Sequence, residues 1–123
     1  MPIATLANAP EFKPGALHIR ALAVPSRGTH ELACWRVDLS PGAGSGVHSL
    51  DREQLIVVQS GAVSATVGTE QLVATAGDTL VLPAHTAVEM RNDGTEPAVA
   101  LVVSAAGFKA SVGSQSFQPP WSL

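Results

Sequence analysis

The sequence predicts an all-β protein, built as an antiparallel sandwich or barrel. The 11 glycines and 9 prolines, together 20 of the 123 residues, divide the chain into short segments rich in valine, leucine, isoleucine and threonine. Several segments alternate apolar and polar side chains with the period of two that is typical of a strand with one buried face. No stretch repeats apolar residues with the 3.6-residue period of a helix over three turns.

Nine segments have the length of a strand and follow one another about every ten residues. In chain order they are residues 16–24, 31–39, 46–50, 54–60, 62–67, 71–75, 79–82, 87–92 and 98–104. Glycine-containing turns such as Ser60-Gly61 and Asn92-Asp93-Gly94 connect them, because glycine tolerates the positive φ angles of tight turns. This spacing predicts a barrel of about nine or ten strands with almost no helix.

The alternation is clearest in residues 33–39. Trp35, Val37 and Leu39 point to one side of the expected strand, and charged side chains point to the other. The apolar side must be covered, so the strand is predicted to be half buried with Trp35 inside the barrel. Cys34 falls on the face opposite Trp35, which argues against a role as an interior nucleophile.

We expect one domain in three parts: an N-terminal strand segment over residues 1–30, a core barrel over about 31–106 and a C-terminal arm over 107–123. The arm is rich in serine, glycine and proline and is expected to cross the barrel surface in extended form. It carries three large apolar side chains, Phe117, Trp121 and Leu123. These side chains should dock into a groove on the same subunit or on a neighbour, which motivates a predicted homodimer.

Composition excludes several classes of protein. Seven Lys and Arg against ten Asp and Glu give a net charge of −3, and the five aromatic residues include no tyrosine. The basic surface and stacking platform of nucleic-acid-binding proteins are therefore missing. Residues 97–106 form the longest nearly uninterrupted apolar stretch, about half of what a bilayer requires, and residues 1–24 lack a signal-peptide pattern. We expect a soluble cytoplasmic protein with no nucleic-acid or membrane partner, and Cys34, the single cysteine, cannot form an internal disulfide.

Two spaced motifs run through the expected barrel. The positions that carry them are Gly42, His48, Gln54, Gly61, Gly77, Pro83 and Asn92. Over roughly residues 31–106 this pattern resembles the two conserved motifs of the cupin superfamily. The resemblance implies a small single-domain cupin barrel, which is an antiparallel double-stranded β-helix or jelly roll.

The chain departs from the cupin pattern where the family binds metal. The resemblance places the ligands of family members at four positions, which here hold His48, Leu50, Gln54 and Val88. Only the histidine is unchanged. A divalent ion in a barrel requires three or four converging histidine, carboxylate or thiolate ligands, so we expect no bound metal and no cofactor. Glu53 lies one place early and faces outward if Gln54 faces inward.

Strand alternation predicts the functional site inside the barrel around His48. The expected lining residues are Gln54, Trp35, Leu50, Ile56, Val88 and Met90, with His85 at the cavity mouth, where the family has a glycine. An imidazole in an apolar cavity can act as a general base, a general acid or a hydrogen-bond anchor. The alternatives are structural: His48 satisfied by a hydrogen bond to Gln54, and His85 as a rim residue without chemistry.

Three functions stay open at this point. The first is a metal-independent isomerase, epimerase, dehydratase or cyclase, in which His48 moves a proton while Gln54 or His85 polarises an oxygen of a small organic substrate. The second is a barrel that binds or senses a ligand without turnover. The third is a metal-dependent oxygenase or isomerase that uses an unusual site of His48, Gln54 and His85.

Overall fold

The computed structural model describes residues 3–123 and consists of β-strands with three short 3-10 turns. The strands are β1 (Glu11–Phe12), β2 (Leu17–Ala23), β3 (Leu32–Leu39), β4 (Ser49–Leu50), β5 (Gln54–Ser60), β6 (Ala62–Val67), β7 (Glu70–Thr75), β8 (Thr79–Leu82), β9 (Val88–Arg91), β10 (Ala98–Ala105), β11 (Ala110–Val112) and β12 (Gln115–Phe117). The 3-10 turns are η1 (Leu6–Asn8), η2 (Pro25–Arg27) and η3 (Pro120–Ser122).

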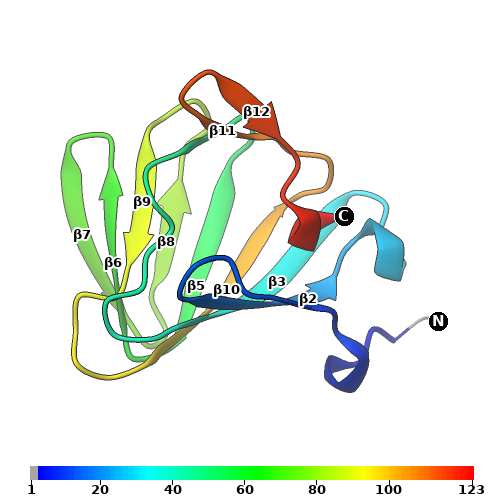
Figure 1. Cartoon of the computed structure of the whole chain (residues 1–123), viewed down its shortest axis with the longest axis horizontal. Helices are drawn as coiled ribbons and strands as arrows, with labels where there is room; N and C mark the ends of the chain where they lie inside the picture. Colours follow the sequence, from blue (N-terminus) through cyan, green and yellow to red (C-terminus); the bar gives the residue numbers. More distant parts are fainter. Residues whose placement is uncertain (1–2) are drawn as a thin grey trace.

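The strands form two walls around one core (Figure 1). One wall is a six-stranded antiparallel sheet in the order β1-β2-β3-β10-β5-β8. The other combines the small sheets β12-β11-β4 and β7-β6-β9, because bridges from Gly44 to Arg91 and from His48 to Val88 join the chain before β4 to β9. The fold is thus the predicted antiparallel double-stranded β-helix.

All nine strands expected from the sequence are present, eight of them within one residue of the expected bounds, whereas the segment expected over 46–50 is a strand only over Ser49–Leu50. The prediction failed at the two ends of the chain. It missed the short strand β1, which pairs with β2, and it described the C-terminal arm as extended, whereas β11 and β12 pair as a hairpin. The arm was missed because strands of three residues are too short to show an alternation.

The predicted inner face of β3 is confirmed. Trp35, Val37 and Leu39 are all buried, and the cross-strand register places Trp35 opposite Val102 of β10. Val102 in turn lies opposite Ile56 of β5, so these side chains form one inward-facing layer. The alternation therefore decides which side chains the barrel encloses.

Cys34 lies on the outer side of β3, as its register predicts. Its side chain is partly buried, and this burial raises the pKa of the thiol above its ordinary value. A thiol with a raised pKa is a weak nucleophile at neutral pH. Nothing in the structure connects Cys34 with the barrel interior.

The C-terminal arm packs on its own barrel. The ring of Trp121 contacts Phe12 in an edge-to-face arrangement, with 6.3 Å between the ring centres, and the carbonyl oxygen of Leu123 accepts a hydrogen bond from the Ser26 amide at 2.8 Å. Figure 1 shows the hairpin above the open end of the barrel and η3 beside β2 and β3. The arm thus contacts its own barrel through Trp121, while the side chains of Phe117 and Leu123 stay 44% and 49% exposed.

A fully bonded asparagine, Asn92, follows β9 and joins the ends of β3 and β9 to the loop before β10. Figure 1 shows that this loop lies at the end of the barrel opposite the hairpin. The Asn92 amide donates to the carbonyl oxygens of Leu39 at 3.0 Å and Glu96 at 2.8 Å, and its oxygen accepts from the Gly94 amide at 3.0 Å. Asn92 is only 1% exposed. Every hydrogen-bonding atom of its side chain is therefore used by the loops that it joins.

The turn at Gly61 also requires its residue type. Its φ angle is +73°, and a Cβ atom there would lie 2.5 Å from the Pro97 carbonyl oxygen. Both facts exclude a larger residue without movement of the β5–β6 turn. Within residues 3–123, no helix is long and apolar enough to cross a membrane.

Candidate functional site

A cavity of about 350 Å³ occupies the barrel interior at the end covered by the C-terminal hairpin. Residues from both walls, the preceding loops and the C-terminal arm line it: Pro14, Gly15, Leu17, Ile19, Trp35, Val37, Gly44, Ser45, His48, Leu50, Gln54, Ile56, Leu82, Val88, Glu89, Met90, Val102, Phe108, Ala110, Val112, Phe117, Pro119 and Trp121. Most of these side chains are apolar. A cavity of this size and character suits a small organic ligand held by few polar contacts.

His48 is fixed by the backbone before β4. Its amide donates to the Val88 carbonyl oxygen at 2.9 Å, and its carbonyl oxygen accepts from the Val88 amide at 2.7 Å. This bridge to β9 places the imidazole in the cavity wall, where it is partly buried. The histidine is therefore held by strand pairing and not by a flexible loop.

The imidazole of His48 has a defined tautomer. Its Nδ1 atom lies 2.9 Å from the carbonyl oxygen of Gly46. A carbonyl oxygen can only accept, so in the neutral ring Nδ1 carries the hydrogen. The lone pair is then on Nε2, which has no hydrogen-bond partner among the described residues. A proton acceptor is thus left free on a cavity-lining side chain.

Gln54 is the buried polar side chain of the cavity and is 4% exposed. Its Nε2 atom donates to the Ser104 hydroxyl at 3.1 Å, and that hydroxyl donates to the Ala105 carbonyl oxygen at 3.2 Å. The second N–H and the Oε1 atom of Gln54 have no partner within residues 3–123. Gln54 therefore offers one donor and one acceptor to a molecule in the cavity.

The sequence analysis considered a hydrogen bond between His48 and Gln54, and the structure corrects this pairing. His48 bonds to Gly46 of its own loop, and Gln54 bonds to Ser104 of the neighbouring strand β10. The idea that the two side chains satisfy each other does not hold. Both line the cavity with hydrogen-bonding capacity unused.

His85 does not line the cavity. Its side chain is exposed, and its backbone has a φ angle of +59°, in the left-handed region that favours glycine. The backbone amide donates to the Leu50 carbonyl oxygen at 2.7 Å. This geometry explains why the related position in the cupin pattern is a glycine, and it separates His85 from the group formed by His48 and Gln54.

The five apolar residues expected to line the cavity all do so: Trp35, Leu50, Ile56, Val88 and Met90. The indole of Trp35 stacks on the ring of Phe108, with 5.6 Å between the ring centres and 15° between the planes. Phe108 is 1% exposed and follows β10. Its role could not be read from the strand pattern, because it lies in the irregular segment between β10 and β11.

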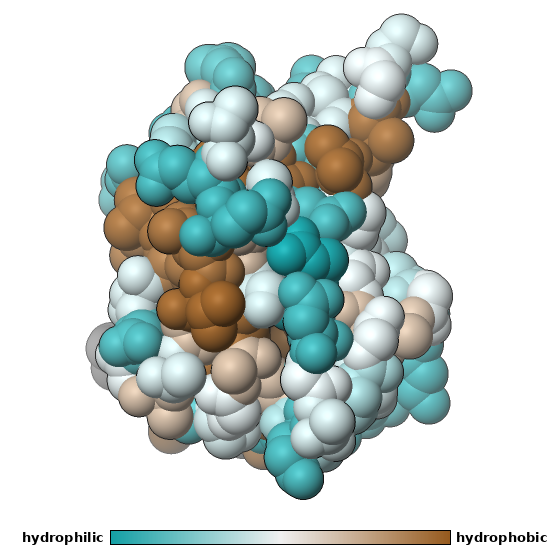
Figure 2. All heavy atoms as spheres, turned by 90° about the vertical axis from the view of Figure 1, so that its left-hand side faces the viewer, coloured by the Kyte–Doolittle hydropathy of each residue, from teal (hydrophilic) through white to brown (hydrophobic). Residues whose placement is uncertain are grey.

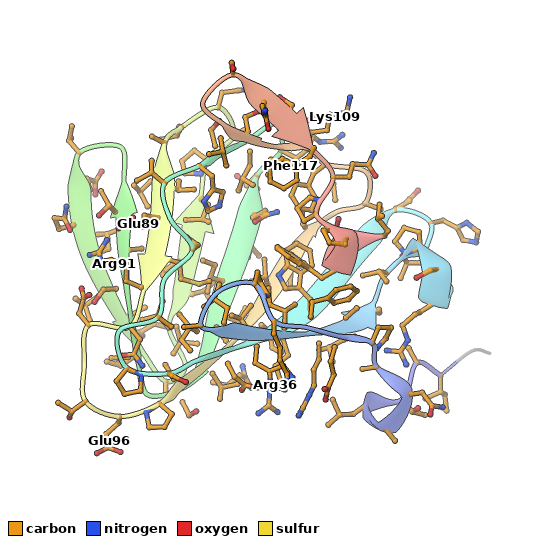
Figure 3. All side chains as sticks on the ribbon, in the orientation of Figure 1. Arg36, Glu89, Arg91, Glu96, Lys109 and Phe117 are labelled. Atoms are coloured by element: carbon orange, nitrogen blue, oxygen red, sulfur yellow. The ribbon has the colours of Figure 1, made fainter. Side chains whose placement is uncertain are left out.

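The C-terminal arm supplies part of the cavity wall that the sequence analysis missed. Val112, Phe117, Pro119 and Trp121 line the cavity, and Figure 3 shows Phe117 below the hairpin, on the side that faces the barrel. Figure 2 shows hydrophobic side chains at the upper right, below the projecting hairpin. The apolar residues in the polar arm were the available signal, but it did not say which groove they enter.

The charged groups near the cavity are few. Glu89 lines it but is paired with Arg91 at 2.9 Å, and the two side chains lie together on the small sheet in Figure 3. The lining residues include no lysine or arginine. In the described part of the chain, no three His, Cys, Asp or Glu side chains gather in a way that could hold a metal ion.

Comparison with known proteins agrees with the fold. Residues 35–104 match the model of the cupin domain family. No curated protein matches the chain. Similar solved structures include the polyketide cyclase RemF from Streptomyces resistomycificus, with a TM-score of 0.79 and 13% identity, covering 98% of this chain and 88% of that one.

Two further structures are similar over most of their length. A sugar phosphate isomerase of the cupin superfamily from Silicibacter pomeroyi has a TM-score of 0.75 and 21% identity, covering 93% of this chain and 83% of that one. KdgF from Halomonas sp. has a TM-score of 0.72 and 19% identity, covering 84% and 93%. At these identities the likeness concerns the fold alone.

Proposed function

Because the chain belongs to the cupin family, whose barrels present an interior site, we propose that it binds a small organic molecule in its cavity and that His48 moves a proton on that molecule without a metal ion. The observation that carries this proposal is the hydrogen bond from Nδ1 to the Gly46 carbonyl oxygen. It holds the ring in the tautomer whose Nε2 lone pair is free. A general base requires such a lone pair within reach of its substrate.

The reaction class is proton transfer beside a carbonyl group. The Nε2 lone pair of His48 takes a proton from the α-carbon, the C–H electron pair becomes the enolate double bond, and the carbonyl oxygen takes the negative charge. The free N–H of Gln54 is the available donor to that oxygen. Return of the proton to another carbon gives isomerisation or epimerisation, loss of a β-hydroxyl as water gives dehydration, and attack on a second carbonyl gives cyclisation.

The residues present do not fit the metal ion that many cupins hold. Leu50 and Val88, at two of the ligand positions of the family pattern, are buried aliphatic side chains in the cavity wall. Gln54 at the third has a neutral amide, which is a poor ligand for a divalent ion. His85, the one replacement that the sequence suggested, is exposed and outside the cavity. No step of the proposed reaction uses a metal.

The test is deuterium exchange at the α-carbons of 2-tetralone, an uncharged bicyclic ketone, followed by NMR in heavy water. We expect the protein to accelerate exchange and His48→Ala to lower the rate by about a hundredfold or more, the usual share of a general base. His30→Ala is the matched control, because His30 is exposed in the loop before β3 and is not among the residues that line the cavity. It should leave the rate unchanged.

Three results would contradict the proposal. Exchange that is equal in the His48→Ala protein would remove the base, and exchange that requires added zinc, iron, nickel or manganese would favour the metal-dependent alternative. Binding of 2-tetralone without any exchange would favour a barrel that binds its ligand without turnover.

We also propose a homodimer, as the sequence predicted, but through the outer face of the large sheet instead of the C-terminal arm. The arm that motivated it packs on its own barrel, whereas the outer face of the large sheet carries a continuous apolar area. Its members are Leu55 and Val57 on β5, Val81 on β8, and Leu101 and Val103 on β10, with Val81 53% exposed. The register places Leu55 beside both Val81 and Val103, so they form one row.

A second copy of the chain fits this face best. It is the outer face of a β-sheet, and sheet faces pack against one another at about 10 Å. Six strands at about 4.8 Å spacing give a face of several hundred Å², on the order of the ~800 Å² that each partner of a stable pair buries. The neighbouring strand β3 carries one positive and one negative side chain, Arg36 and Asp38, which form an ion pair. Figure 3 shows Arg36 on the outside of the sheet.

Light scattering tests the dimer. We expect a mass near twice 12.6 kDa, lost in Leu101→Lys and kept in Val73→Lys, an equally severe change at an exposed position of β7. A monomeric wild-type protein, or equal masses for the two variants, would contradict the proposed face.

The cytoplasmic location predicted from the sequence stays a prediction, which fractionation of the producing cells would check.

A further inference from the structure

The polar groups and rings of the cavity together define the chemistry of its ligand. This inference rests on the proposed function, since it concerns the same cavity. Three independent features bear on it: the charge of the lining, the shape of the aromatic walls, and the balance of free donors and acceptors.

The lining favours an uncharged ligand. His48 and Glu89 are the only titratable residues among the lining side chains, and Glu89 is already paired with Arg91. A phosphate or carboxylate group in the cavity would meet no lysine or arginine. Burial of an anion without a counter-charge costs several kcal/mol, so sugar phosphates and organic acids are disfavoured.

The walls favour a ring. Four of the five aromatic side chains of the chain line the cavity, namely Trp35, Phe108, Phe117 and Trp121. Trp35 and Phe108 stack on each other with 15° between their planes, so the pair has a fixed orientation in the cavity wall. A planar or bicyclic ligand can stack on such a wall or meet it edge-on, at ring distances of about 4.5–7 Å.

The free hydrogen-bonding groups favour a hydroxyl on the ligand. The hydrogen of the Ser104 hydroxyl goes to the Ala105 carbonyl oxygen, so this hydroxyl must accept from Gln54. That fixes the orientation of the amide and leaves Oε1 of Gln54 free as an acceptor. His48 and Gln54 together therefore offer two free acceptors, Nε2 and Oε1, and one free N–H donor. A carbonyl oxygen on the ligand uses the donor, and a hydroxyl is needed for the remaining acceptor.

We propose that the ligand is an uncharged, hydroxyl-bearing ring compound with a carbonyl group, largely apolar elsewhere. The ring lies against the aromatic wall, and the hydroxyl donates to Oε1 of Gln54. Its α-carbon faces His48. Molecules that lack the hydroxyl bind more weakly, because they leave a buried acceptor of Gln54 without a partner.

The chain carries its own reporters for a binding test. Trp35 and Trp121 are the only tryptophans, and both line the cavity, so tryptophan fluorescence follows its occupation. The probes are 2-tetralol, its methyl ether and the tetralin-2-carboxylate anion, which share one bicyclic skeleton and do not absorb at the red edge of the tryptophan band. The ether keeps the shape but has no donor, and the carboxylate adds a charge.

We expect 2-tetralol to bind about tenfold more tightly than the ether, the effect of one hydrogen bond, and the carboxylate to bind at least tenfold more weakly than 2-tetralol. Gln54→Met should reduce the affinity for 2-tetralol to that of the ether and leave the ether unchanged. Exposed Gln59 on the same strand provides the control variant Gln59→Met, with no change for either probe.

Tighter binding of the carboxylate, or equal affinities for 2-tetralol and its ether, would overturn the ligand class. The binding test and the exchange test of the proposed function can fail independently of each other. If the affinities follow the expected order but 2-tetralone exchange does not depend on His48, the base is wrong and the ligand class stands. If exchange depends on His48 but the affinity order is reversed, only the ligand class fails.

Discussion

Two buried amide side chains at opposite ends of the barrel, Asn92 and Gln54, differ in how completely they are bonded. Asn92 is 1% exposed and uses both N–H groups and its oxygen on backbone atoms. Gln54 is 4% exposed and uses one N–H group, on Ser104. Burial alone does not distinguish them. The unused hydrogen-bonding capacity does, and it marks Gln54 as the amide that is available to a ligand.

The largest expected effect is on the bonded amide. Asn92→Ala removes three hydrogen bonds and leaves the buried carbonyl oxygen of Leu39 and the partly buried one of Glu96 without this donor. We expect the free energy of unfolding to fall by about 3 kcal/mol, measured by urea denaturation. Ligand affinity per folded molecule should not change. A loss below about 1 kcal/mol would show that water satisfies these groups as well as Asn92 does.

For Gln54 we expect the opposite of the result for Asn92: a small loss of stability and a large loss of ligand affinity. Gln54→Met keeps the length of the side chain and removes one hydrogen bond, and Ser104 retains its bond to the Ala105 carbonyl oxygen. The free energy of unfolding should fall by about 1 kcal/mol or less, while the affinity for 2-tetralol falls about tenfold. If denaturation showed that Gln54→Met destabilises the protein as much as Asn92→Ala, the amide would be a structural group and the contrast would fail.

The same contrast separates the two candidate histidines. His48 sits in a strand bridge with its Nε2 free, and His85 occupies a left-handed turn with φ of +59°. His85→Gly should raise the free energy of unfolding by up to about 1 kcal/mol, because glycine adopts this conformation without strain. Measuring 2-tetralone exchange in this variant shows whether the side chain of His85 contributes to the rate. A lower free energy of unfolding for His85→Gly would mean that the exposed imidazole makes contacts that outweigh the backbone strain.

The sequence predicted the barrel well because its walls are made of alternating strands. The nine segments, the inward row of Trp35, and the turn glycines all follow from the period of two and from backbone conformation. The same alternation identified Leu50, Val88 and Met90 as lining residues, since strands of one motif point their side chains inward together.

Alternation could not predict the parts of the site that depend on loops. Phe108 lies in the segment between β10 and β11 and Trp121 in the 3-10 turn η3, so neither belongs to a strand pattern. Gln54 proved to bond Ser104, 50 positions away in the chain, which only the cross-strand register reveals. His85 was expected at the cavity mouth because it precedes the strand that carries Val88, whereas its left-handed backbone conformation is not visible in the sequence.

The smallest expected effect concerns a partly buried group without any partner. Burial raises the pKa of Cys34 above its ordinary value of 9.0, so the folded state holds the thiol proton to higher pH than the unfolded state. This contribution to stability is complete below the ordinary value and is lost as pH rises through the folded pKa. Relative to Cys34→Ala, the wild-type free energy of unfolding should therefore be flat at neutral pH and fall in alkaline solution. A wild-type free energy of unfolding that rises relative to Cys34→Ala in alkaline solution would contradict the raised pKa.

The central claim, that His48 presents a free Nε2 lone pair to the cavity, can be observed directly by NMR of the imidazole nitrogens in ¹⁵N-labelled protein, with His48→Ala to assign the signals. We expect the hydrogen on Nδ1, bonded to the Gly46 carbonyl oxygen, and a shift of the Nε2 signal when 2-tetralone enters the cavity. A ring with its hydrogen on Nε2, or an Nε2 signal that ignores the ligand, would contradict it.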